Sequence, residues 1–310
     1  MTAAQVVVLG RVSVDLPPDA VRRPIEAVSS FRRCIGGYGG NVATGLARLG
    51  VAVAVVATVG DDGHGRFARG YLEREGVDVS AMRLEEDART PLAFYEAWPP
   101  DHFPVTFYPS QAYWAIEPGQ VRGELLAAPL MLVSGTSLAH EPSRSIALEV
   151  IAARTHTAQT LLDLDWRPVL WTDPAVAGPI VESALSSVDA VIGSEAEFDA
   201  LGLSAPDVAA ERRVVYLKRG ERGARFMDGT SVIDAEAIQV DTVCGLGAGD
   251  AFAASVAEGI LRGREVSTTL RRANAAGALA ATRMETSDSM PTSAEIDELL
   301  ASRSAEAMAR

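Results

Sequence analysis

The chain has 310 residues, 48% of them hydrophobic, and a formal net charge of −13. Its length and apolar content are sufficient for one large α/β domain, which we expect to span residues 1–310. The acidic surface repels nucleic-acid phosphates and anionic lipids, which argues against nucleic-acid and membrane partners. Two cysteines, Cys34 and Cys244, are too few for a disulfide framework, so we expect a cytoplasmic protein.

Apolar strand-like runs and amphipathic helical segments alternate along the chain. Val6 to Leu9 predicts a buried strand, and Asn41 to Leu49 predicts a helix that ends at Gly50. The further strands expected are 51–59, 130–133, 160–164, 190–192 and 214–217, and the further helices are 65–74, 248–261, 266–283 and 294–300. This alternation predicts a mainly parallel sheet covered by helices on both faces.

Three segments, at about 11–16, 31–36 and 91–109, do not fit that sheet. The first alternates apolar and polar residues, and the last is interrupted by prolines that suit an edge strand. We therefore expect a small β-lid over one edge of the main sheet. Ligands of such sheets bind at the carboxyl ends of the strands, where the lid would close the crevice. An exposed apolar lid face also favours a homodimer.

The loop Gly247-Ala248-Gly249-Asp250 opens a long apolar helix. Small residues let the backbone approach a ligand closely, and the N–H groups at a helix start favour a phosphate. Asp250 would then lie beside the phosphate, where it can accept the proton of an attacking hydroxyl. The alternative is an ordinary tight turn followed by an acidic residue at the helix start. The four histidines, His64, His102, His140 and His156, lack the spacing of a metal site.

A second glycine cluster, Gly36-Gly37-Tyr38-Gly39-Gly40-Asn41, also precedes a predicted helix. Asn41 at the helix start either caps the helix or reaches a ligand hydroxyl, and position alone favours the cap.

These two loops, in this order, resemble those of the ribokinase-like, or PfkB, family of carbohydrate kinases. Gly60-Asp61-Asp62 with Gly65, and the turn that begins Lys218-Arg219-Gly220, match further stretches of the family. The resemblance covers essentially the whole chain and implies a ribokinase-like fold with ATP and Mg²⁺ as cofactors. The stretches 10–16, 141–145, 162–168, 245–252, 273–278 and 289–292 resemble those of the 5-dehydro-2-deoxygluconokinase subgroup, which acts in bacterial myo-inositol breakdown.

The resemblance also implies roles for individual residues. Asp250 would be the base, and Gly247, Ala248 and Gly249 would form an anion hole for the transferred phosphoryl group. The implied contacts to the sugar hydroxyls are Asp15, Gly37 and Asn41. The implied contacts to the nucleotide are Lys218, Gly220, Gly245, Gly247, Gly249 and Asn274. Asp15 has the alternative of an outward-facing acid, and Asn274 that of a surface helix residue.

Arg167 is the residue that bears most on specificity. A sugar acid needs a cation for its carboxylate, and a guanidinium offers a planar bidentate match. Arg11 and Arg89 are weaker candidates for the same contact. The alternative for Arg167 is an ion pair with Asp163 or Asp165.

The chain departs from the family pattern at three places. Cys244-Gly245-Leu246 stands where many relatives have Asp-Thr-x, and Pro109 stands where the subgroup often has an arginine. Ser194 replaces the asparagine of the motif linked to magnesium, while Glu197 is retained and is expected to contact the ion through water. Ser194 to Glu197 also has the sequence of a helix capping box, which is the structural alternative.

The sequence therefore predicts a kinase that transfers the γ-phosphate of ATP to a hydroxyl of a sugar acid, with 5-dehydro-2-deoxy-D-gluconate as the first candidate. The alternatives are a kinase of the same fold for 2-keto-3-deoxygluconate, another sugar or a nucleoside, and a nucleotide- or sugar-binding protein without catalysis.

Overall fold

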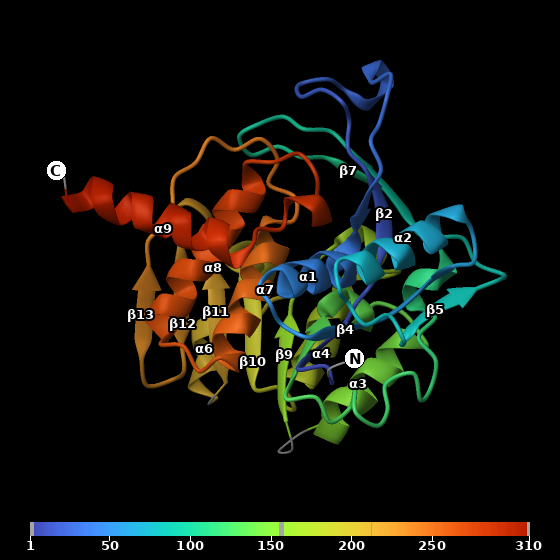
Figure 1. The fold of residues 1–310 in the computed structure, drawn as a ribbon. Coiled ribbons are helices and arrows are strands. Elements are labelled where there is room, and N and C mark those ends of the chain that lie inside the picture. The colour runs from blue at the N-terminus through green and yellow to red at the C-terminus, as the bar shows by residue number, and fades with distance from the viewer. Residues whose placement is uncertain (1–2, 155–157, 212, 309–310) are drawn as a thin grey trace.

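A computed structural model describes residues 3–154, 158–211 and 213–308. Its main sheet has the strand order β13-β12-β11-β10-β9-β8-β1-β4-β5 (Figure 1). Pairing is parallel from β11 to β5, and antiparallel between β11, β12 and β13. The strands are β1 (Val6–Leu9), β4 (Val53–Gly60), β5 (Met82–Glu85), β8 (Leu130–Ser134), β9 (Gln159–Asp163), β10 (Ala190–Ser194), β11 (Val214–Lys218), β12 (Ala224–Met227) and β13 (Val232–Ala235).

Helices cover both faces of this sheet. The helices are α1 (Gly37–Arg48), α2 (Gly63–Arg74), α3 (Ser143–Arg154), α4 (Ala177–Leu185), α5 (Glu195–Ala200), α6 (Ala205–Ala210), α7 (Ala248–Leu261), α8 (Val266–Ala281) and α9 (Ser293–Met308). Side chains alternate between the faces of a strand, so Val6 and Val8 pack in one apolar cluster while Val7 and Leu9 pack in the other. The first cluster includes α1, α7 and α8, and the second includes α3 and α4. The predicted fold class is confirmed.

A second, smaller sheet stands above one edge of the main sheet (Figure 1). It contains β2 (Ser13–Leu16), β3 (Cys34–Gly36), β6 (Leu92–Tyr95) and β7 (Val105–Tyr108), in the order β3-β2-β6-β7. Two antiparallel pairs, β3 with β2 and β6 with β7, are joined by a parallel pair between β2 and β6. These strands fall within the three segments that the sequence set apart from the main sheet.

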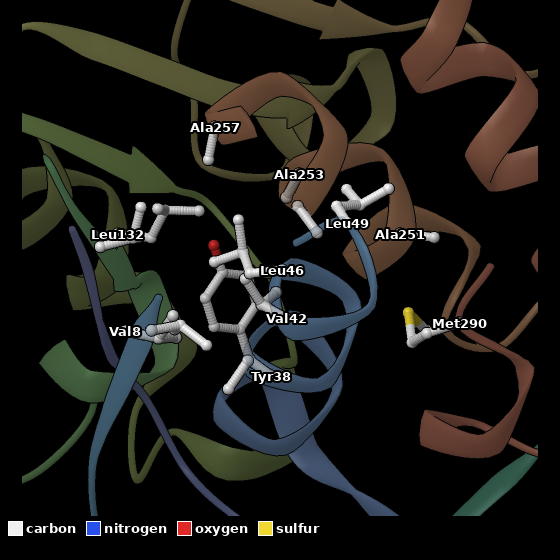
Figure 2. Packing of buried hydrophobic residues seen from close by; sticks show 14 of the residues in the cluster. Val8, Tyr38, Val42, Leu46, Leu49, Leu132, Ala251, Ala253, Ala257 and Met290 are labelled. Carbon is white, nitrogen blue, oxygen red and sulfur yellow. The ribbon is translucent and has the colours of Figure 1, made fainter. Parts of the chain in front are cut away.

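Helices α1 and α7 cross closely over the main sheet (Figure 2). Tyr38, Val42 and Leu46 of α1 are buried in the same cluster as Ala253 and Ala257 of α7. Gly45 lies at the crossing, because a methyl group on it would lie only 2.9 Å from the Cβ of Ala254. Small residues therefore allow the two helix backbones to approach each other, which brings the N-terminal ends of α1 and α7 together.

Several element boundaries differ from the sequence expectation. Helix α1 begins at Gly37 rather than at Asn41, since the glycines form its first turn. The segment 91–109 contains two strands, and β5 and the hairpin of β12 and β13 were not predicted. The strands of the hairpin are short, and β13 is largely exposed, as Val232 shows. A short, exposed strand needs few apolar residues, so its sequence carries only a weak strand pattern. None of the helices in the described residues is both long and apolar enough to cross a membrane.

Candidate active site

The loop before α7 has the geometry that its glycines predict. Gly247 caps the helix with φ = +84°, in the left-handed region that favours glycine, and α7 begins at Ala248. Asp250 is therefore the third residue of the helix, within its first turn. The free N–H groups and the helix dipole at this end favour a bound anion.

Asn41 lies opposite Asp250 and does not cap α1. Gly36 holds the cap position, so Asn41 is inside the helix, and the capping interpretation is wrong. Its Nδ2 donates a hydrogen bond of 2.7 Å to Asp250 Oδ2, and its Oδ1 accepts one of 2.7 Å from Ser287 Oγ. The two motifs from opposite ends of the chain therefore meet in one hydrogen-bonded pair.

The glycines before Asn41 are required by a close backbone approach. Gly37 has φ = +75°, and a methyl group on it would lie 2.6 Å from the carbonyl oxygen of Arg11. The N–H of Gly39 donates to that same oxygen at 2.8 Å. The first turn of α1 is thus packed against the connection between β1 and β2, and a side chain would separate them.

Two cavities adjoin the Gly247–Asp250 loop. The smaller one lies under the second sheet and is lined by polar residues together with Tyr95, Val105 and Phe107. The predicted site residues that line it are Arg11, Asp15, Gly37, Asn41, Arg167, Gly247 and Asp250. We call it the sugar-side pocket.

The larger cavity, of about 640 Å³, lies between β11, the segment 237–242 and the helices α7 and α8. We call it the nucleotide-side cavity. The predicted nucleotide contacts that line it are Lys218, Gly220, Gly245, Gly249 and Asn274, and Ala248 lines it as well. Asn274 Nδ2 donates to the carbonyl oxygens of Ala235 and Glu236, so it also fixes the edge of this cavity. Arg22 and Asp101 reach the cavity from loops of the second sheet.

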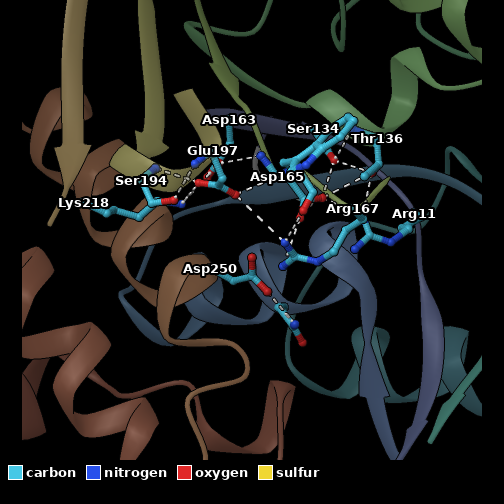
Figure 3. Close-up of polar contacts among 12 residues, drawn as sticks. Arg11, Ser134, Thr136, Asp163, Asp165, Arg167, Ser194, Glu197, Lys218 and Asp250 are labelled. Atoms are coloured by element: carbon cyan, nitrogen blue, oxygen red, sulfur yellow. Dashed lines mark hydrogen bonds and ion pairs between the residues drawn. The ribbon is translucent and has the colours of Figure 1, made fainter. Parts of the chain in front are cut away.

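A row of alternating charges runs along the carboxyl ends of the parallel strands (Figure 3). Its members, which we call the charged row, are Arg11, Asp165, Arg167, Glu197, Lys218 and Asp163. The contacts are Arg11 to Asp165 at 2.5 Å, Asp165 to Arg167 at 3.3 Å, Arg167 to Glu197 at 4.0 Å, Glu197 to Lys218 at 3.4 Å and Lys218 to Asp163 at 3.5 Å. The row thus extends from the sugar-side pocket to the nucleotide-side cavity.

Asp165 is the most tightly held member of this row. Its Oδ2 accepts hydrogen bonds from Arg11 Nη1 at 2.5 Å and from Ser134 Oγ at 2.7 Å, and its Oδ1 faces Arg167. Its backbone has φ = +36°, an uncommon value for a residue with a side chain. Burial opposes ionisation, but Arg11 and Arg167 hold the pKa of this carboxyl at about 2.

The carboxyl of Asp250 has the opposite environment. Burial, followed by the charge of Asp165, raises the pKa of Asp250 to about 6, although the hydrogen bond from Asn41 opposes this shift. Asp250 is therefore ionised at neutral pH, and its pKa is close enough to 7 for the carboxylate to accept a proton. These are the properties of a general base.

Asp15 is also buried and lines the sugar-side pocket, so the alternative of an outward-facing acid is wrong. It accepts hydrogen bonds from Ser13 Oγ at 2.9 Å and from Thr286 Oγ1 at 3.0 Å. Burial raises the pKa of Asp15 to about 6, and the two hydroxyl groups limit that increase.

Arg167 has the ion pair that the sequence left open as an alternative, with Asp165 rather than Asp163. Its side chain is nevertheless 38% exposed and lines the sugar-side pocket. Arg11, in contrast, is buried, and its Nη1 bonds both Asp165 and Thr136. Arg89 does not reach the site, since its side chain is exposed and lines neither cavity.

Glu197 does not fit a direct magnesium ligand. Ser194 and Glu197 form the capping box, in which Glu197 Oε2 accepts from the N–H of Ser194 at 2.7 Å. Oε1 accepts from the N–H of Trp166 at 3.1 Å, and Lys218 and Arg167 add two cations. Within residues 3–154, 158–211 and 213–308, no group of three metal-ligating side chains is found. His156 lies outside the described residues.

Some site residues were not foreseen from the sequence. Thr286 and Ser287 contact Asp15 and Asn41 from the connection between α8 and α9, and no local pattern marks them. Ser134 and Thr136 lie at the carboxyl end of β8. Since ligands bind at the carboxyl ends of parallel strands, their position could have marked them as site residues.

A family model described as pfkB family carbohydrate kinase matches residues 3–293. The chain belongs to this family, and it is a sugar kinase. The 5-dehydro-2-deoxygluconokinase of Bacillus licheniformis is 31% identical over 313 residues, covering 96% of each chain. The enzyme of that name from Bacillus subtilis is 30% identical over 316 residues, covering 97% of each chain.

Solved structures agree with this assignment. A fructokinase double mutant from Vibrio cholerae O395, with fructose, ADP and potassium ion bound, superposes with a TM-score of 0.86 and 25% identity. The match covers 96% of this chain and 98% of that chain. A putative ribokinase II from E. coli, also at a TM-score of 0.86, is 21% identical and covers 96% and 99% of the two chains, which shows the shared fold.

Because the Arg11–Asp165 ion pair is buried, we expect its loss to lower the stability of the protein strongly. Replacing Arg11 by Met leaves a buried carboxylate without its main partner, and we expect a loss of about 3–5 kcal/mol in the free energy of unfolding. Urea denaturation followed by circular dichroism measures this loss. The control is Arg66→Met, which breaks an exposed pair with Asp61 and should cost less than about 1 kcal/mol. Equal stability of the two variants would contradict the role of the buried pair.

Proposed function

We propose that this sugar kinase transfers the γ-phosphate of ATP to a hydroxyl of a sugar acid, with 5-dehydro-2-deoxy-D-gluconate as the acceptor. One observation carries the proposal. Gly247 and Asp250 line the sugar-side pocket, while Ala248 and Gly249 between them line the nucleotide-side cavity. A donor in one cavity and an acceptor in the other would meet at this loop.

Asp250 acts as the base in the proposed reaction. The acceptor hydroxyl loses its proton to the carboxylate while its oxygen attacks the γ-phosphorus. The N–H groups of Ala248 and Gly249 at the start of α7 stabilise the charge on the transferred group. Asn41 orients Asp250 through its hydrogen bond of 2.7 Å.

The choice of a sugar acid rests on Arg167. Two guanidinium groups, those of Arg11 and Arg167, share the carboxylate of Asp165. Arg11 is enclosed by its partners, so the partly exposed Arg167 is the cation that a substrate carboxylate can reach. The relatives named 5-dehydro-2-deoxygluconokinase support this acceptor, and with it a place in myo-inositol breakdown.

Magnesium would accompany the phosphates of ATP, whose charge it neutralises when bound. The water-mediated magnesium contact of Glu197 stays a prediction, and the four protein partners of its carboxylate oxygens argue against it. A cytoplasmic location stays a prediction as well.

Replacing Asp250 by Asn tests the base. We expect kcat to fall by about 10²- to 10⁴-fold, because the amide cannot accept the proton. In the parent enzyme, kcat/KM should fall as the pH drops below about 6, where Asp250 becomes protonated. A coupled assay of ADP release from pH 5 to 8 measures both effects. Asp15 titrates in the same pH range. The control is therefore Asp15→Asn, in which kcat/KM should still fall at low pH because Asp250 is intact. Full activity of Asp250→Asn would refute the role of Asp250 as the base.

Replacing Arg167 by Met tests the acceptor class. With a sugar acid we expect kcat/KM to fall by about 10- to 150-fold, the effect of losing a hydrogen bond to a charged group. With a neutral ketohexose the change should stay below about threefold. The control is Arg89→Met, which should leave kcat/KM for both acceptors unchanged because Arg89 lies outside the sugar-side pocket. The proposal of a sugar-acid acceptor would be overturned if the enzyme turned over neutral sugars well but no sugar acid, 2-keto-3-deoxygluconate included.

The homodimer through the second sheet also stays a prediction. On one face of that sheet Phe31, Phe94 and Tyr108 stack edge to face, and Tyr108 is 57% exposed. Such an aromatic face suits burial between two copies. Sedimentation velocity should give a dimer for the parent and a monomer for Tyr108→Glu. A monomeric parent at micromolar concentration would refute the dimer.

A further inference from the structure

Lys218 is the only lysine in the sequence, which has 27 arginines. It ends β11, and its side chain is only 18% exposed. All other cations counted in the net charge are therefore arginines, which occur both on the surface and in buried pairs. A single lysine, placed among buried carboxylates, indicates that this position needs an ammonium group rather than a guanidinium.

The surroundings of Lys218 show why a compact cation fits there. A methyl group on Gly249 would lie 3.4 Å from Lys218 Nζ, so the ammonium group lies against the first turn of α7. Nζ also lies 3.5 Å from Asp163 Oδ1 and 3.4 Å from Glu197 Oε2. The planar group of an arginine is larger and requires a fork of acceptors, whereas an ammonium group is a compact point charge.

The two carboxylates are themselves fixed. Glu197 is held by the N–H groups of Ser194 and Trp166, and Asp163 Oδ1 accepts from the N–H of Asp165 at 3.2 Å. Lys218 also lines the nucleotide-side cavity together with Gly249, the residue before Asp250. Its charge is thus held in the nucleotide-side cavity beside the residue that precedes Asp250, where the phosphoryl group would pass.

We propose that Lys218 is a catalytic residue whose ammonium group contacts the transferred phosphoryl group, and that Asp163 and Glu197 are positioning residues that hold it there. The proposal rests on the proposed kinase function and deepens it. It gives Glu197 the role of orienting Lys218, in place of the water-mediated magnesium contact that the sequence predicted.

The reaction balances without a proton from Lys218. The bond between the γ-phosphorus and the bridging oxygen breaks, and its electron pair leaves with ADP. The bond to the acceptor oxygen forms, and the hydroxyl proton passes to Asp250. Burial opposes the charge of Lys218, but Asp163 and Glu197 raise the pKa of its ammonium group above its ordinary value. Lys218 therefore stays a cation throughout and stabilises the charge on the phosphoryl oxygens.

The test uses Lys218→Met and Lys218→Arg in the full-length enzyme, with the acceptor on which the parent is most active. We expect Lys218→Met to lower kcat by about 10²- to 10³-fold, as the loss of one stabilising donor does. The affinity for ADP, measured by calorimetry, should change by less than about threefold, because ADP lacks the transferred group. Lys218→Arg keeps the charge but not the shape, and should recover part of kcat.

Arg222→Met is the matched control, since Arg222 is an exposed cation of the following turn that does not line the cavity. Its kcat should equal that of the parent. A kcat of Lys218→Met within threefold of the parent would overturn the proposal. So would a loss that appears only as weaker binding of ADP and ATP, which is the result for an ordinary nucleotide contact.

Glu197→Gln tests whether Glu197 positions Lys218. It also tests the role of Lys218 if the Lys218→Met variant does not fold. We expect a decrease in kcat of about tenfold, with the Mg²⁺ concentration for half-maximal rate unchanged. Recovery of the rate at high Mg²⁺ would instead show a metal contact and overturn the assignment of Glu197. If the parent phosphorylates no acceptor, the proposed function fails, whereas an active parent with unaffected variants refutes only the role of Lys218.

Discussion

The site depends on the close crossing of helices α1 and α7. Gly45 permits the crossing, because its missing side chain lets α1 lie against Ala254 of α7. The N-terminal ends of both helices then face each other, and Asn41 reaches Asp250. The carboxyl that serves as the proposed base is thus positioned by residues distant in sequence. A wider crossing would leave Asp250 buried without its hydrogen-bond donor, which is an unfavourable state for a carboxylate.

The charged row completes the site along the edge of the sheet. Adjacent parallel strands end at the same edge, so residues at or just beyond the carboxyl ends of β1, β9, β10 and β11 meet there although they are scattered along the chain. Alternation of sign lets six charged groups be buried or half-buried together, since each carboxylate has a cation beside it. Arg11 of this row lines the sugar-side pocket, and Lys218 lines the nucleotide-side cavity. The row therefore connects the two cavities between which the proposed transfer would take place.

The second sheet contributes to both cavities. Its strands place Asp15, Tyr95 and Phe107 on the sugar-side pocket, and its loops extend Arg22 and Asp101 to the nucleotide-side cavity. This arrangement would help to exclude water from the place where the phosphoryl group is proposed to be transferred. Burial away from water also explains why Asp250 and Asp15 have raised pKa values, whereas the two arginines beside Asp165 lower its pKa.

The sequence by itself determined the parallel sheet, the segments of the second sheet, and the loop with Asp250. The periodicity of strands and helices and the placement of glycines are local properties, so the sequence alone contains them. The sequence did not determine the role of Asn41, because its cap-like position is local whereas its partner Asp250 is far away in the chain. It also offered Arg89 as a site residue, and only the tertiary structure showed that this side chain points elsewhere. The pairing of Arg167 with Asp165, the four partners of Glu197 and the place of Lys218 beside Gly249 were likewise decided by the fold. Ion pairs and pKa values depend on which strand ends become neighbours, and that depends on the order of strands in the sheet.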